Sequence, residues 1–182
     1  QDLRRVDSIL RQAVVVRKLY DNIVSYLSSL FSSGSMTEEQ ATQTAGMMYI
    51  LSDIERTDAL CTEATESLQS ILEKKHKLSP EAVEDLCRGL KIIEDMYQNV
   101  LEVIRTGNGE DARKIVHKKD NVLDLTLKLR KNHMKRVKQG ACDAEMTSDF
   151  TRILHSFDRI GNSCANIADA ALTGVSFESV LK

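Results

Sequence analysis

The chain has 182 residues, of which 42% are hydrophobic, 4% aromatic and 29% charged. This length is enough to bury a sizeable core, and the shortage of aromatic residues argues against a β protein. Because 25 basic residues are balanced by 27 acidic ones, no global charge draws the protein to nucleic acid or to an anionic membrane.

A few polar or glycine-containing links divide the chain into helices. Thr37 predicts a helix start, because Gln40 three residues later completes a capping box. Ser79 and Pro80 predict another start, with proline at the first helical position. Long helices joined by short links predict an all-α fold, an antiparallel bundle of about five long helices. The predicted helices cover approximately residues 3–31, 37–75, 79–106, 110–138 and 143–174.

Two further features bear on the compartment. No apolar run approaches the roughly 18 residues that a bilayer-spanning helix needs, and no signal peptide opens the sequence. The four cysteines lie far apart, which argues against a metal knuckle or a disulfide framework. Taken alone, the sequence predicts a soluble protein from a reducing compartment.

An internal repeat relates two of the predicted helices. ILSDIERTDALCTEA, residues 50–64, lies over ILHSFDRIGNSCANI, residues 153–167, at an offset of 103 residues. The same offset aligns Asp21 with Asp124. One offset that aligns two separate pairs of helices indicates duplication.

Acidic and amide side chains border the apolar arcs of the last two predicted helices. Asp120 and Asp124 are one turn apart, and Asp158 and Asn162 repeat this spacing. If the two helices are antiparallel neighbours, the four side chains form an oxygen-rich cluster suited to Mg²⁺, Ca²⁺ or iron. Acids beside an apolar stripe more often pair with Lys or Arg on the next helix, or face solvent, so this alternative stays open.

The sequence contains no combination of residues that indicates a catalytic site. His76, His117, His133 and His155 are scattered, and we expect them on the surface, with His155 as a peripheral ligand candidate near Asp158. No Cys-His-Asn or Ser-His-Asp grouping and no glycine-rich phosphate loop can be argued, so we do not expect an enzyme. A di-metal carboxylate enzyme is the weakest alternative, since the Glu-x-x-His motifs of such sites are absent.

Three segments resemble PhoU-like proteins. FDRIGNSCANIADAAL and DIERTDALCTEATESL resemble the E-R-I-G-D-x-x-x-N-I-A segments of that family, and KKDNVLDLTLKL resembles its acidic (E/D)-x-x-x-D helix. The resemblance covers nearly the whole chain and implies two three-helix bundles related by duplication, the first of which lacks one helix here. It divides the chain into an incomplete first half, residues 1–78, a second half, residues 79–175, and a tail, residues 176–182.

The stretch YDNIVSYLSSLFSSGSMTEEQ resembles most closely the PhoU-like domain that follows the membrane segments of bacterial sodium/phosphate cotransporter-related proteins. This resemblance implies a non-catalytic regulatory domain of phosphate transport, cytoplasmic and tethered at the inner face of the cell membrane. The implied partners are the transporter segment of the same chain or phosphate-signalling proteins. A free-standing helical adaptor without bound metal is the alternative.

The resemblance also implies a metal site, with Mg, Mn or Fe as the ion. Carried over residue by residue, the ligands are Asp120, Asp124, Asp158 and Asn162. Asn162 stands where the family has Asp, which removes one negative charge and weakens the affinity for a hard cation. Because the motif departs from the family pattern at Asn162, the alternative is that the site binds no metal.

The first half departs further from the family pattern. Arg17 brings a cation to where the metal would sit, so we expect no metal there. Asp58, aligned with Gly161, projects into an apolar arc and should find Arg17 or another partner, because an unpaired buried carboxylate is costly. The first helix also carries AVVV and YLSSLF, and such apolar surface favours a homodimer or docking on another segment.

Overall fold

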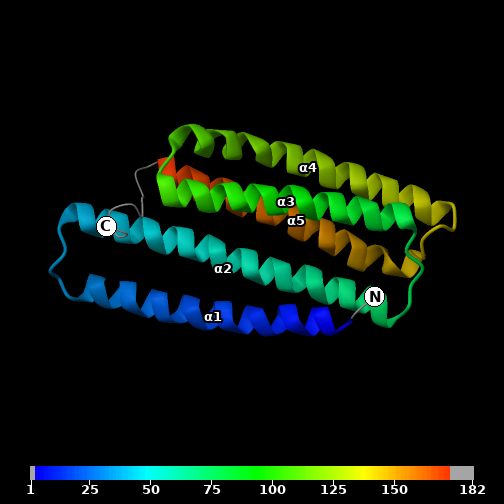
Figure 1. Ribbon diagram of the computed structural model, residues 1–182, viewed down its shortest axis with the longest axis horizontal. Coiled ribbons are helices and arrows are strands. Elements are labelled where there is room, and N and C mark those ends of the chain that lie inside the picture. Colours follow the sequence, from blue (N-terminus) through cyan, green and yellow to red (C-terminus); the bar gives the residue numbers. More distant parts are fainter. Residues whose placement is uncertain (1–2, 173–182) are drawn as a thin grey trace.

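The computed structural model describes residues 3–172, which form five long α-helices and one short 3-10 helix and contain no strand (Figure 1). The predicted all-α bundle is therefore confirmed. The predicted tail at 176–182 lies outside the described residues. The helices are α1 (Leu3–Ser32), α2 (Glu38–Glu73), α3 (Pro80–Thr106), α4 (Gly109–Lys138), η1 (Ala144–Met146) and α5 (Thr147–Leu172).

Local capping sets the starts of α2 and α3. The Gln40 N–H donates to the Thr37 hydroxyl at 3.2 Å, and the Thr37 N–H donates to Gln40 Oε1 at 2.9 Å. The Ala82 N–H donates to the Ser79 hydroxyl at 3.2 Å. Each cap satisfies a backbone donor that has no partner inside the helix. Both predicted starts are confirmed.

The last helix begins later than predicted. The sequence placed its start near residue 143, but η1 occupies Ala144–Met146 and α5 begins at Thr147. The polar link before it allows a 3-10 turn, and such turns are frequent at the ends of α-helices. The predicted boundary was therefore a few residues too early.

Helix α5 is the central helix of the bundle. It packs against α2, α3 and α4, and in Figure 1 it runs behind α3, between α2 and α4. Val122 of α4 lies over Gly161, where an added Cβ would approach it to 3.2 Å. Phe157 packs over Gly89 of α3, where a Cβ would come within 2.8 Å of the ring. The two glycines therefore let neighbouring helices approach α5 closely.

Two links at one end of the bundle are fastened to each other. The Lys77 N–H donates to the Asp143 carboxylate at 2.6 Å, and the Asp143 N–H donates to the Lys77 carbonyl at 3.1 Å. Lys77 Nζ also donates to the Gly140 carbonyl at 2.9 Å. The link between α2 and α3 and the link before α5 thus form one hydrogen-bonded corner.

Helix α1 lies at the edge of the bundle and packs against α2 (Figure 1). Val6 and Leu27 are buried. Much of its apolar surface is uncovered, because the other described helices lie on the far side of α2. Its exposed large apolar side chains are Ile9, Val14, Val15, Leu19, Ile23, Tyr26 and Phe31.

Candidate functional site

The four predicted metal ligands are not drawn into one cluster. Asp120 and Asp124 are exposed on α4, each two residues from Val122, which faces α5. Two residues turn an α-helix by about 200°, so both carboxylates lie on the solvent side of α4. Across residues 3–172, no three His, Cys, Asp or Glu side chains gather closely enough to hold a metal ion. Ion binding by Asp120, Asp124, Asp158 and Asn162 stays a prediction.

The two predicted ligands on α5 lie one turn apart. Asp158 is half-buried and Asn162 is exposed. Asn162 Nδ2 donates to the backbone carbonyl of Asp158 at 2.9 Å. The amide of Asn162 is therefore engaged within its own helix. His155, the predicted peripheral ligand, is exposed.

Between α1 and α2, a cation lies beside the acids, as the sequence predicted. Arg17 Nη1 of α1 lies 2.7 Å from Glu55 Oε1 of α2. Burial raises the pKa of the Asp58 carboxyl above its usual value, the Arg17 charge acts against this, and the Glu55 charge adds to it. Arg17 thus pairs with Glu55 across α1 and α2, and its charge also acts on Asp58.

Two acids that the sequence argument missed join α2 to α5. Asn166 Nδ2 of α5 donates to Asp53 Oδ1 of α2 at 3.4 Å, with Arg56 Nη1 3.7 Å from the same oxygen. Farther along, the Ser70 hydroxyl of α2 donates to Asp149 Oδ2 of α5 at 2.8 Å. Residue 53 therefore meets 166 while residue 70 meets 149, so the two helices run antiparallel. Two of the polar side chains of α5, Asp149 and Asn166, therefore bind α2.

A nearly buried ion pair joins α3 to α4. Arg136 Nη1 donates to Asp85 Oδ2 at 2.8 Å, and their side chains are 11% and 6% exposed. Asn132 Nδ2 donates to the same oxygen at 3.4 Å, and Arg88 binds the other one. Burial acts to raise the pKa of Asp85, but the hydrogen bonds from Arg136, Asn132 and Arg88 outweigh it and hold this pKa below its usual value.

The prediction of surface histidines is wrong for His133, and the His76 side chain is also only 9% exposed. The His133 ring is fully buried and stacks on Phe150, with centroids 4.1 Å apart and planes 12° apart. His133 Nε2 lies 3.3 Å from Thr147 Oγ1. Burial, and secondarily the Arg136 charge, lowers the pKa of His133. The imidazole is therefore a packed core side chain.

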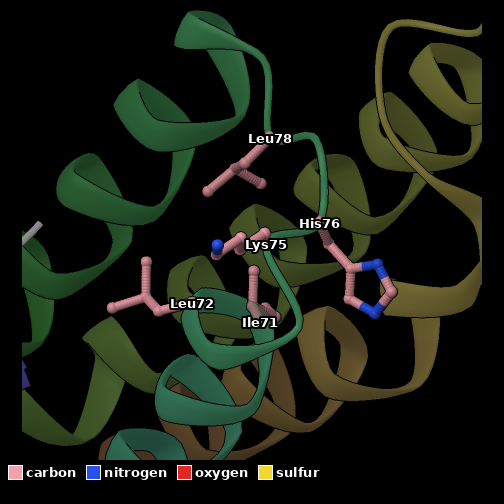
Figure 2. A pocket seen from close by; sticks show the side chains of 5 residues that line it. All are labelled: Ile71, Leu72, Lys75, His76 and Leu78. Carbon is pink, nitrogen blue, oxygen red and sulfur yellow. The ribbon is translucent and has the colours of Figure 1, made fainter.

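A small pocket lies where α2 ends and the link to α3 begins (Figure 2). Its volume is about 120 Å³, and its lining residues are Ile71, Leu72, Lys75, His76 and Leu78. Figure 2 shows the His76 ring turned away from the other four side chains. Ligand pockets usually exceed roughly 300 Å³ and carry converging polar groups, so this hollow does not make a catalytic site.

The fold and these contacts define a class: a helical bundle whose buried polar groups hold helices together. Residues 86–171 match the family model described as the PhoU domain. The match covers most of α3, all of α4 and nearly all of α5. No curated protein matches the chain. Within residues 3–172, none of the helices combines the length and the apolar character needed to cross a membrane.

Proposed function

We propose that this protein is a non-catalytic PhoU-type regulatory domain that acts in phosphate transport. The observation that carries the proposal is the match of residues 86–171 to the PhoU domain. The packing supports it, since the buried charges of Asp85, Asp53 and Asp149 are engaged in contacts between helices. Such a bundle offers rigid surfaces for binding other proteins.

The finer assignment is to the cytosolic part of a sodium/phosphate cotransporter-related protein. The resemblance of residues 20–40 to transporter-linked domains supports it. In this arrangement the domain is held at the inner face of the membrane by the transporter segment of its own chain, which is its first partner. A free-standing adaptor that binds phosphate-signalling proteins is the alternative.

Phosphate uptake in the native host tests the function. Codons for residues 86–171 are deleted, and uptake of radioactive phosphate is measured in phosphate-rich and phosphate-poor medium. We expect uptake to stay high in rich medium, where wild-type cells reduce it, and complementation to restore the reduction. An immunoblot of the remaining protein controls for its abundance. Unchanged uptake in both media at equal abundance contradicts the proposal.

Metal binding is a separate part of the proposal and rests on the motif resemblance alone. A divalent or ferric ion at Asp120, Asp124, Asp158 and Asn162 requires these side chains to move together. Metal analysis after purification without chelator, with Mn²⁺, Fe³⁺ or Mg²⁺ supplied, tests it. Stoichiometric metal that is lost in the double variant Asp120→Ala, Asp124→Ala supports the site. If the wild-type protein stays metal-free at saturating ion concentration, the metal-binding part of the proposal is wrong, and the adaptor without bound metal remains.

A further inference from the structure

The second half of α4 is strongly basic on its outer side. Residues 125–142 contain six lysines and arginines and no acidic residue. We define the basic face as the exposed side chains of this stretch that share one side of the helix: Leu127, Lys128, Lys131, Met134, Lys135 and Lys138. At about 100° per residue they span an arc of about 120°, on the far side from the buried Leu129 and His133. Leu127 and Met134 are 50% and 42% exposed.

The charge of the basic face is not compensated by the rest of the bundle. Among residues 3–172 its lysines form no ion pair, whereas Arg136, on the inner side of α4, pairs with Asp85 at 2.8 Å. Asp120 and Asp124 lie one turn or more before Lys128. Helix α4 runs along the edge of the bundle opposite α1, with its inner side against α3 and α5 (Figure 1). Because the net charge is only −2, this concentration of positive charge is local.

We propose that the basic face binds the surface of an anionic membrane, with α4 lying along the lipid headgroups. Clusters of about four to eight lysines or arginines on an amphipathic helix are typical of binding to anionic lipid. The lysines reach the lipid phosphates through their long side chains, while Leu127 and Met134 enter the headgroup region. This contact goes beyond the proposed function, because it needs no transporter segment.

Two features favour a lipid surface over an acidic protein as the partner. The cations of the basic face are all lysines, and lysine is depleted at protein–protein interfaces, where arginine is enriched. A protein that binds a basic amphipathic helix encloses its apolar side in a groove, whereas the apolar side of α4 is buried against α5. The side of α4 that stays available is one open strip, which suits a flat surface.

Cosedimentation of the full chain with lipid vesicles tests the proposal. At low salt the protein should bind vesicles of phosphatidylserine and phosphatidylcholine but not vesicles of phosphatidylcholine alone, and added salt should weaken the binding. The double variant Lys131→Gln, Lys135→Gln should lower the partition constant about 25-fold, since each lysine near an anionic surface contributes roughly fivefold. The matched control is Arg11→Gln, Lys18→Gln, which removes the same charge from exposed positions of α1 and should bind like wild type.

Circular dichroism shows whether each double variant keeps its helices, so that loss of binding is not confused with unfolding. A wild-type protein that does not bind the anionic vesicles at low salt overturns the proposal and leaves the basic face to an acidic protein. Equal weakening in the two double variants also overturns it, because binding would then follow the net charge and not the basic face. Phosphate uptake is measured separately, so failure of this proposal is distinguishable from failure of the proposed function.

Discussion

At the scale of single residues, Asp85 and His133 show how the bundle holds titratable groups in its interior. Asp85 is charged and nearly buried, and Arg136 compensates its charge at 2.8 Å. His133 is buried and stacks on Phe150. Protonation of either group should therefore lower stability as the pH falls, because Asp85 must stay charged and His133 must stay neutral.

Asp85→Ala should strongly destabilise the protein. It leaves the Arg136 guanidinium buried without its counter-charge, and breaking such a pair typically costs about 3–5 kcal/mol. Asp95→Ala is the control, since Asp95 pairs with Lys91 at 3.0 Å on the surface, where solvent screens the pair and its loss should change stability little. Urea unfolding at neutral pH measures both. Equal losses in the two variants would contradict the role of the buried pair.

His133 should make stability fall in mild acid. Its pKa in the folded protein is lowered, mainly by burial, so the unfolded chain takes up a proton that the folded protein refuses. This contribution is complete above the unfolded value of about 6.5 and is lost progressively as the pH falls toward the folded pKa. His133→Gln should flatten the decrease between neutral pH and about pH 5.5, in urea unfolding series. The exposed His117→Gln should keep the wild-type slope, and a slope unchanged in His133→Gln would refute this assignment.

At the scale of elements, the end of α2 places a lysine, Lys75, in a backbone conformation that favours glycine. The His76 N–H donates to the Ile71 carbonyl at 3.2 Å, which closes the helix end, and Lys75 has φ 54°. This left-handed conformation suits glycine and costs other residues about 1–2 kcal/mol. The neighbouring Lys74, with φ −75°, carries no such cost.

Lys75→Gly should therefore stabilise the protein by about 1 kcal/mol, because glycine adopts the left-handed conformation without the steric penalty. Lys74→Gly should destabilise it by about 0.5–1 kcal/mol, since glycine loses more backbone freedom in a helical conformation. Thermal unfolding of the two variants gives the comparison. A loss of stability in Lys75→Gly would show that its side chain contributes more than its backbone conformation costs.

The starts of α2 and α3 were predictable because their signals are local. Thr37 with Gln40, and Ser79 with Ala82, lie within one turn of each other, so the sequence contains the whole interaction. The candidate site was not predictable in this way, because it depends on which face of each helix meets a neighbour. Leu123, for example, is an apolar residue next to Asp124 in the sequence, yet it is 44% exposed and does not belong to the face of α4 that packs on α5.

The buried row of α4 includes polar residues that an apolar pattern overlooks. Thr126 and His133 are buried in line with Val122 and Leu129. His133 follows Leu129 by one turn and Thr126 by two, and this spacing was the signal that could have identified it. Asp53 of α2 is similar, since it precedes Leu60 by two turns in the buried row of its helix. Helical periodicity shows on which face of a helix a side chain lies. Which residue it contacts there depends on how the helices pack.

At the scale of the whole molecule, the seam between α2 and α5 joins the α1–α2 hairpin to the three helices α3, α4 and α5. The repeat aligns the same two helices, since residues 50–64 correspond to residues 153–167. The two copies of the repeated segment thus pack against each other. This antiparallel seam holds the buried acids Asp53 and Asp149 between helices, and it leaves α1 at the edge of the bundle.

Distances between spin labels across the seam test it most directly. Labels are placed at the exposed positions 56 and 162 in one sample and 56 and 152 in a second, after replacement of the four native cysteines. In an antiparallel seam position 56 lies beside 162, whereas 152 is displaced along α5 by on the order of 15 Å. Double electron–electron resonance should therefore give a clearly shorter distance for 56 and 162. A shorter distance for 56 and 152, or equal distances, would contradict the seam.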